Sequence, residues 1–173
     1  MTRQRALQIL TIGYEGVSLA DFLATLKAAG VRQLLDIREL PISRRKGFSK
    51  SALSTALAEA GIGYAHERAL GSPRELRYRL REDGDLPRFF SDFREYLATQ
   101  RTLLDTLART VTGAVALLCY ERNPAECHRS VVATALARRA QSTVQHLTVP
   151  LHGHQQAPHD TRPHPRQSLS ATE

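Results

Sequence analysis

The sequence contains little cysteine and no long hydrophobic run, and each absence excludes a class of protein. There are two cysteines in 173 residues, too few for a disulfide-stapled scaffold, so both are interpreted as thiols. No apolar run approaches the roughly 18 to 20 residues that cross a bilayer. The opening MTRQRALQIL has no apolar signal core before a cleavage site. We therefore expect a cytoplasmic protein with no membrane association.

The sequence is also poor in aromatic side chains and in lysine. Tryptophan is absent and aromatic residues make up 6% of the chain, which gives little support to a surface that stacks the bases of single-stranded nucleic acid. Only three of the 24 basic residues are lysine, and the formal net charge is +7. Arginine suits phosphate and carboxylate groups, so the excess indicates an anionic partner, unless it reflects the base composition of the host genome.

Length and composition indicate one folded domain followed by a tail. A chain of 173 residues with 42% hydrophobic and 24% charged residues is typical of a single soluble domain. We assign this α/β domain to residues 1–150. Residues 151–173 are rich in His, Gln, Pro, Ser and Thr and cannot bury enough apolar surface to order themselves, so they predict a disordered tail.

Apolar strands alternate with amphipathic helices along the domain. The Arg-rich stretch 68–84 is punctuated by Gly71-Ser72-Pro73 and is interpreted as a loop with one helical turn at most. Apolar runs and periodic apolar positions predict strands at 7–12, 33–37, 62–66, 114–118 and 144–149, and helices at 19–30, 49–61, 87–109 and 124–140. This alternation predicts a three-layer α/β/α fold with a mostly parallel five-stranded sheet, Rossmann-like or flavodoxin-like.

Polar residues follow the first two strands, at the edge where parallel sheets bind ligands. The GYEG turn at 13–16 lets the backbone approach a ligand closely, which makes Tyr14 and Glu15 candidates; the alternative is a tight strand-to-helix turn. Asp36 and Arg38 lie two residues apart, so both point to the same side of an extended chain. They are candidates for the same site, or they form a simple ion pair.

A basic segment, SRRKGFSK at 43–50, leads into the second helix. It carries four cations, among them Arg44 and Lys50, together with the hydroxyls of Ser43 and Ser49. A helix N-terminus normally favours acidic residues, so cations there run against the macrodipole. The mismatch indicates a bound anion such as phosphate, held by Ser43, Arg44 and free N–H groups; a solvated basic loop is the alternative.

The segment CYERNPAECHR at 119–129 follows the fourth strand. Cys127 is predicted in the first turn of the last helix beside His128 and Arg129, an environment expected to stabilise a thiolate and lower the pKa of Cys127. Glu121 lies two residues beyond Cys119. A reactive thiol is therefore one interpretation of this segment.

Other interpretations of the cysteines remain open. Free cysteine is often a buried small hydrophobe, and Cys119 and Cys127 are also candidates for a redox pair. Cys119, Cys127 and His128 offer three zinc ligands, but their spacing does not match short zinc motifs, so we predict no metal. A cysteine phosphatase is excluded, because the positions six residues after each cysteine, 125 and 133, are alanines.

Four segments together resemble one family. TIGYEG, LLDIRELPISRRKGFSK, GIGYAHERALGSP and LLCYERNPAECHRSVVATAL are similar to the bacterial and archaeal domain of unknown function 488, from about Ile9 to about Leu147. The resemblance implies an α/β fold with the motif residues around one pocket. Roles suggested for relatives lean toward nucleotide or nucleic-acid processing. Relatives often carry a paired glycine where this chain has Ala-Leu-Gly-Ser at 69–72, so the sequence does not predict the shape of that loop.

The leading functional hypothesis is an enzyme that acts on a phosphate-bearing substrate, a nucleotide or a nucleic-acid end. Arg38, Arg44 and Arg129 would hold anionic oxygens and Ser43 would donate a hydrogen bond. Asp36, Glu15 or Glu121 would act as general base or orient a water. The alternatives are a binding or regulatory module that uses the same pocket without turnover, and thiol redox chemistry at the two cysteines. The sequence identifies no cofactor.

Overall fold

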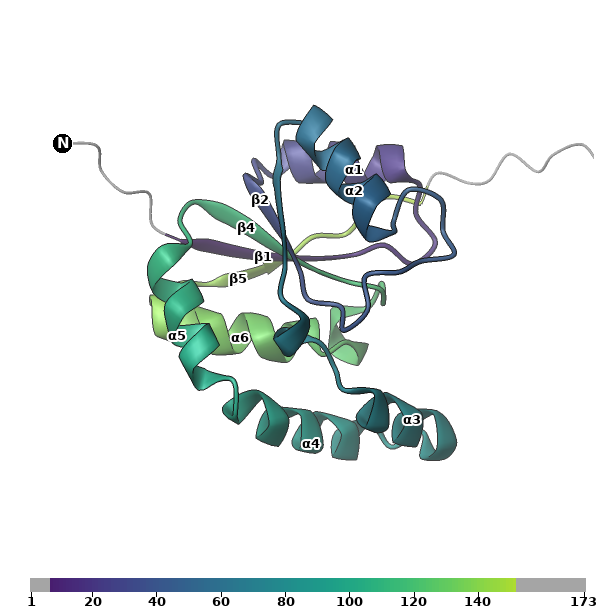
Figure 1. Ribbon diagram of the computed structural model, residues 1–173, viewed down its shortest axis with the longest axis vertical. Helices are drawn as coiled ribbons and strands as arrows, with labels where there is room; N and C mark the ends of the chain where they lie inside the picture. The colour runs from purple at the N-terminus through teal and green to yellow at the C-terminus, as the bar shows by residue number, and fades with distance from the viewer. Residues whose placement is uncertain (1–6, 152–173) are drawn as a thin grey trace, which may run out of the picture.

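The structure is a computed structural model that describes residues 7–151. The predicted tail at 151–173, apart from its first residue, lies outside the described residues. Five strands form one parallel sheet in the order β3-β2-β4-β1-β5. They are β1 (Gln8–Gly13), β2 (Gln33–Asp36), β3 (Gly63–His66), β4 (Ala114–Cys119) and β5 (Val144–His146). With helices on both faces, the predicted three-layer α/β fold is confirmed (Figure 1).

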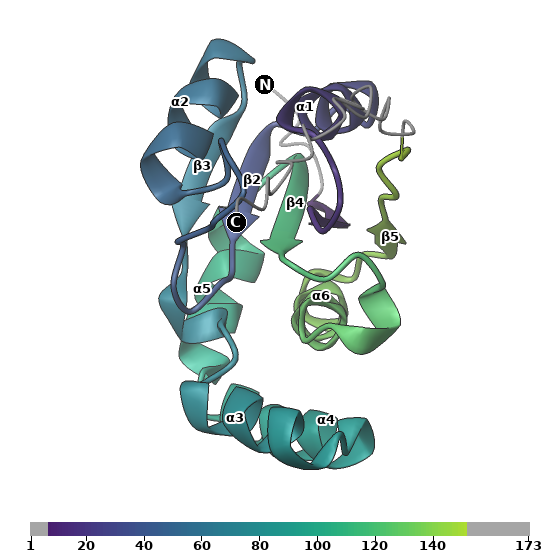
Figure 2. The same ribbon diagram turned by 90° about the vertical axis from the view of Figure 1, so that its right-hand side faces the viewer.

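The described residues form six α-helices. On one face of the sheet lie α1 (Leu19–Ala28) and α2 (Lys50–Glu59), and on the other α5 (Arg101–Thr110) and α6 (Arg129–Ala140) (Figure 2). Beyond α6, α4 (Leu86–Ala98) packs beside α3 (Arg74–Asp83). Among the described residues, no helix is both long and apolar enough to span a bilayer.

Alternation along the strands divides the core into two clusters. Successive strand residues point to opposite faces, so Ile9 and Leu35 join the side chains of α4, α5 and α6, whereas Leu10 and Leu34 join those of α1 and α2. All six residues of β4 are buried, as expected for a strand with a neighbour on each side and helices over both faces.

Four sequence-based expectations were wrong. The stretch interpreted as a loop forms α3, because arginine and leucine favour helix, Leu76 and Leu80 contact the core one turn apart, and Gly84 ends the helix at φ 68°. The predicted helix 87–109 is two helices, which part at Thr99 and Gln100. The last helix begins at Arg129, after the 3₁₀ turn η2 (Pro124–Glu126), and β5 ends at His146.

The strand order creates a crevice at the carboxyl ends of the central strands. β1 and β4 are neighbours, and Gly13 pairs with Cys119 at their last position. The chain leaves β1 toward α1 on one face and leaves β4 toward α6 on the other. Such a reversal is where open α/β sheets bind ligands. The fold therefore directs attention to the residues that follow β1, β2 and β4.

Candidate functional site

A cavity of about 440 Å³ opens at this edge of the sheet. Its wall combines the ends of β1 and β4, the loop after β2, and one side of α3 and α4. The residues that line it are Tyr14, Arg38, Glu39, Leu40, Ile42, Ser43, Arg44, Arg45, Ser72, Arg77, Leu80, Phe89, Cys119, Tyr120, Glu121, Glu126 and His128. Six of the sequence-predicted site residues, Tyr14, Arg38, Ser43, Arg44, Glu121 and His128, are thus brought together.

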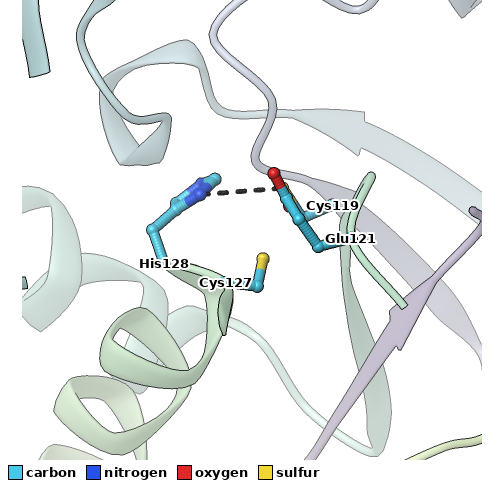
Figure 3. A group of neighbouring side chains, drawn as sticks. All are labelled: Cys119, Glu121, Cys127 and His128. Carbon is cyan, nitrogen blue, oxygen red and sulfur yellow. Dashed lines mark hydrogen bonds between the residues drawn. The ribbon is translucent and has the colours of Figure 1, made fainter. Parts of the chain in front are cut away.

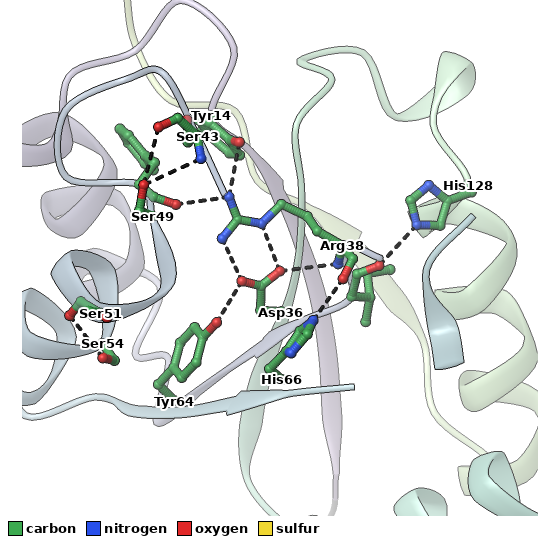
Figure 4. A network of polar contacts seen from close by, with 12 residues as sticks. Tyr14, Asp36, Arg38, Ser43, Ser49, Ser51, Ser54, Tyr64, His66 and His128 are labelled. Atoms are coloured by element: carbon green, nitrogen blue, oxygen red, sulfur yellow. Dashed lines mark hydrogen bonds and ion pairs between the residues drawn. The ribbon is translucent and has the colours of Figure 1, made fainter. Parts of the chain in front are cut away.

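Asp36 and Arg38 form a buried ion pair (Figure 4). The guanidinium donates from Nε to Asp36 Oδ1 at 2.8 Å and from Nη2 to Oδ2 at 2.6 Å. Tyr64 donates its hydroxyl to the same Oδ2 at 2.7 Å, and the side chain of Asp36 is fully buried. Burial and the Asp36 carboxylate raise the pKa of Tyr64. Burial opposes the charge on Arg38, but Asp36 outweighs it and raises the pKa of Arg38. Of the two interpretations of Asp36 and Arg38, the structure therefore contains the ion pair.

The rest of the Arg38 guanidinium fastens the basic segment to the sheet. Nη1 donates to the Tyr14 hydroxyl at 3.0 Å and to the Phe48 carbonyl at 2.9 Å. The rings of Tyr14 and Phe48 stack with centroids 4.5 Å apart. Every nitrogen of Arg38 therefore has a protein partner, and this clamp ties β1, β2 and the approach to α2 together.

Four potential ligand side chains converge where β4 ends: Cys119, Glu121, Cys127 and His128 (Figure 3). One ligand atom from each lies within 4.8 Å of all the others. Cys119 Sγ donates to Glu121 Oε2 at 3.1 Å and lies 3.6 Å from His128 Nδ1. We call these four side chains the thiol cluster.

The electrostatics of the thiol cluster overturn one sequence expectation. Burial and the neighbouring Cys119 raise the pKa of Cys127 well above its ordinary value, so the predicted lowering is wrong. Burial alone would raise the pKa of Glu121, but hydrogen bonds from Cys127 and Cys119 lower it below its ordinary value. Burial alone would lower the pKa of His128, yet its contacts with Cys127 and the charge of Glu121 raise it. The cluster contains a carboxylate that stays ionised.

Besides Asp36 and Cys127, three sequence-predicted residues lie outside the cavity wall. Arg129 is fully buried, where Nη1 donates to the Glu121 carbonyl and Nη2 donates to the Arg122 carbonyl at 2.9 Å. Glu15 accepts the Arg122 amide at 3.0 Å, which fastens the turn after β1 to the loop after β4. Lys50 is exposed at the start of α2. Arg129 and Glu15 therefore hold backbone, and Lys50 points into solvent.

Hydroxyl groups hold the basic segment in shape. Ser49 occupies the N-cap position of α2 but makes no side-chain bond to that helix; its Oγ donates to the Ser43 carbonyl at 3.1 Å. Ser43 Oγ accepts the amide of Arg45 at 3.1 Å. The Arg45 guanidinium donates to the Val17 carbonyl at 2.5 Å. This frame leaves Arg44 exposed on the cavity wall, with no ion pair to any described residue.

Comparison with known proteins gives a family. The family model described as Domain of unknown function DUF488 matches residues 18–136, which is more than half of the chain. The chain belongs to this family. No curated protein and no solved structure matches it. The DUF488 match includes the strand ends of β2 and β4 and all of the thiol cluster, whereas Tyr14 and Glu15 lie before it.

The cavity of this chain also includes residues that sequence reasoning missed. Ser72 is 1% exposed and its hydroxyl has no hydrogen-bond partner among the described residues. Arg77 of α3 forms a 2.5 Å ion pair with Glu39 on the wall. Ile42 is 72% and Tyr120 is 43% exposed, both large for hydrophobic side chains. The signal for Ile42 was an apolar residue directly before the basic segment. Nothing in the sequence placed Ser72 in the cavity.

Proposed function

We propose that the protein is an enzyme that acts on a phosphate-bearing substrate, a nucleotide or a nucleic-acid end, bound in the cavity at the carboxyl ends of the strands. One observation carries the proposal. The same wall presents an arginine without an ion pair, a buried hydroxyl without a partner, and exposed apolar side chains. A nucleotide offers a phosphate and an apolar ring to match them.

Three polar residues of the cavity wall, Ser43, Arg44 and Ser72, are suited to a phosphate group. An arginine fork binds phosphate oxygens with parallel hydrogen bonds. The Ser72 hydroxyl is buried and has no hydrogen-bond partner among the described residues. An unpaired buried polar group costs free energy, so a ligand oxygen that bonds to this hydroxyl would remove that cost. We therefore assign Arg44 and Ser72 to phosphate recognition.

Three apolar side chains of the wall, Leu40, Ile42 and Tyr120, are 51%, 72% and 43% exposed. Three of the five large exposed hydrophobic side chains in the described residues line this one cavity. A ring placed against them would remove that apolar surface from water. The cavity volume of about 440 Å³ lies within the roughly 300 to 1,000 Å³ typical of small-molecule sites.

Among the carboxylates proposed from the sequence, Glu121 is the one on the cavity wall. Both oxygens of Asp36 already accept hydrogen bonds in the buried pair, and Glu15 accepts a backbone amide outside the wall. We therefore assign the chemical step to Glu121 with Cys119 and His128. The Asp36–Arg38 pair has a positioning role.

A binding screen followed by a turnover assay tests the proposal. Nucleoside mono-, di- and triphosphates, sugar phosphates and short oligonucleotides are screened by thermal shift against wild type, Arg44→Ala and Arg32→Ala. Arg32 is an exposed arginine just before β2, at the amino ends of the strands and so away from the cavity. A ligand at a hundredfold its Kd adds about 2.7 kcal/mol of stability.

We expect a phosphate-bearing compound to shift wild type and Arg32→Ala, and to bind Arg44→Ala about tenfold more weakly, the loss of one charge-assisted hydrogen bond. Wild type should then convert that compound, and Glu121→Gln should bind it without converting it. Equal binding by Arg44→Ala and wild type would contradict the assignment of Arg44. Binding without turnover by wild type would instead indicate the binding or regulatory module.

A further inference from the structure

We propose that the thiol cluster is a zinc site, with Cys119 Sγ, Cys127 Sγ, His128 Nδ1 and a carboxylate oxygen of Glu121 as the four ligands. Two sulfurs, one imidazole nitrogen and one carboxylate oxygen form a donor set that zinc accepts in proteins. Hard cations such as Mg²⁺ and Ca²⁺ prefer oxygen ligands throughout. The chemistry of the side chains therefore favours a transition-metal ion such as Zn²⁺ over Mg²⁺ and Ca²⁺.

The spacing of the ligand atoms fits one tetrahedral ion. Zinc bonds of about 2.3 Å to sulfur and 2.0 to 2.1 Å to nitrogen, at tetrahedral angles, separate a sulfur from a nitrogen by about 3.6 Å. Cys119 Sγ and His128 Nδ1 are 3.6 Å apart, and Cys119 Sγ and Glu121 Oε2 are 3.1 Å apart. With all four atoms within 4.8 Å of one another, an ion at their centre requires only small side-chain movements.

Neighbouring groups orient two of the ligands as they would around a metal. His128 Nε2 lies 3.3 Å from the Ile37 carbonyl, and donation to that oxygen leaves the Nδ1 lone pair facing the cluster. The backbone amide of Arg129 points at Cys127 Sγ from 3.5 Å, which stabilises negative charge on sulfur. Each contact is of the kind that fixes a metal-bound side chain.

The carboxylate of Glu121 also favours a bound cation. The Glu121 side chain lies just beyond a buried strand, yet no ion pair joins it to a lysine or arginine in the part of the chain that the structure describes. The neighbouring guanidinium of Arg129 is directed to backbone carbonyls instead. A partly buried carboxylate beside two thiols is costly without a compensating charge, and a divalent ion supplies it.

Sequence spacing alone gave three ligands and no zinc motif, and the expectation of no metal followed from that. The fold brings Glu121 to the cluster as a fourth ligand, because β4 ends at Cys119 and the chain turns there before α6 begins. Cys119, Glu121 and His128 line the cavity, whereas Cys127 lies outside the wall. A bound ion would therefore form part of the cavity surface, and Glu121 would serve there as a metal ligand. The site rests on these side chains alone and stands whether or not the cavity binds phosphate.

Cobalt spectroscopy tests the site without any substrate. Untagged full-length protein is reduced, stripped with a chelator and titrated with Co²⁺ while the near-ultraviolet thiolate-to-cobalt absorption is recorded. We expect saturation at about one Co²⁺ per chain, and displacement by one equivalent of Zn²⁺. The four histidines beyond residue 151 cannot produce this absorption, since it requires thiolate ligands.

Variants separate the cluster from other metal-binding groups. We expect Cys119→Ser and Cys127→Ser to lose at least half of the absorption and Glu121→Gln to bind Co²⁺ at least tenfold more weakly. His146→Gln, a histidine outside the cluster, should titrate as wild type does. No absorption in wild type, or undiminished absorption in Cys119→Ser, overturns the proposal.

A second measurement covers the case in which the serine variants do not fold. Iodoacetamide alkylation of reduced wild type is followed with and without Zn²⁺, and zinc should slow the reaction of both thiols at least tenfold. Equal alkylation rates overturn the zinc site. Neither result bears on Arg44-dependent ligand binding, so the two proposals fail separately.

Discussion

Gly13 lies so close to Glu121 that a β-carbon at position 13 would stand 2.0 Å from the Glu121 carbonyl oxygen. The contact joins the end of β1 to the loop that follows β4. No side chain fits between them, because the clash is with backbone atoms. The requirement for glycine here comes from space, since φ at Gly13 is not in the left-handed region.

Gly13→Ala should therefore displace the Glu121 loop and lower the free energy of unfolding by about 1 to 3 kcal/mol, the usual cost of overpacking a closed site. Urea denaturation measures the loss. Gly63→Ala is the matched control, because a β-carbon there stands 3.6 Å from its nearest neighbour, an ordinary contact. If both variants unfold at the same urea concentration, the close approach at Gly13 is not a constraint in solution.

Tyr64→Phe removes one of the donors to the buried Asp36 carboxylate. The loss should lower the free energy of unfolding by about 1 to 2 kcal/mol, because one acceptor site on that buried oxygen loses its partner. Tyr78→Phe serves as control, since Tyr78 is 57% exposed. Thermal or urea unfolding at pH 7 compares the two, and equal stabilities would mean that Asp36 does not depend on Tyr64.

The same residue predicts a dependence on alkaline pH. The pKa of Tyr64 is raised in the folded state, by burial and by Asp36, whereas the unfolded chain releases that proton near pH 10. The folded state therefore holds one proton more above pH 10, so this stabilisation is complete below pH 10 and is lost as pH rises further. The stability difference between wild type and Tyr64→Phe should shrink from pH 8 to pH 10.5, as measured by urea unfolding. A constant or growing difference would contradict the raised pKa.

Arg129→Lys should destabilise the protein by about 2 kcal/mol or more. The fully buried guanidinium donates to Thr11 Oγ1 and to the carbonyls of Glu121 and Arg122, and a single ammonium group cannot reach all three. Arg32→Lys, an exposed change, should stay within about 0.5 kcal/mol of wild type. A stable Arg129→Lys variant that fails to bind the phosphate ligand would return Arg129 to the anion-binding role proposed from the sequence.

Strands and their order of appearance were predictable because apolar runs end where the backbone must turn. The run 114–118 was correctly predicted as a strand, since a strand covered on both faces is apolar throughout, and β4 extends only one residue further, to Cys119. The helix α3 was missed because its charged composition and the preceding Gly-Ser-Pro resemble a loop. Only two leucines, Leu76 and Leu80, mark its inner side, and a pattern of two positions is too short to reveal a period.

For the site, the sequence indicated which strand ends mattered but not what each side chain contacts. Asp36 and Arg38 were recognised together, and their mutual pairing was one of two alternatives that only the fold could decide. The pKa of Cys127 was predicted in the wrong direction, because helix position was weighed and burial, which depends on tertiary packing, was not. Ser72 matters because its buried hydroxyl has no hydrogen-bond partner among the described residues. No local sequence pattern encodes that property.

The central position of β4 has a consequence for how ligand binding would affect hydrogen exchange. β4 has strand neighbours on both sides and is buried along its length, so its amides should exchange only when the whole domain opens. A molecule held at its carboxyl end must leave before that opening. Any genuine ligand of the cavity, or an ion held by the thiol cluster, should therefore slow deuterium uptake in the interior of β4, several residues from the nearest atom that it touches.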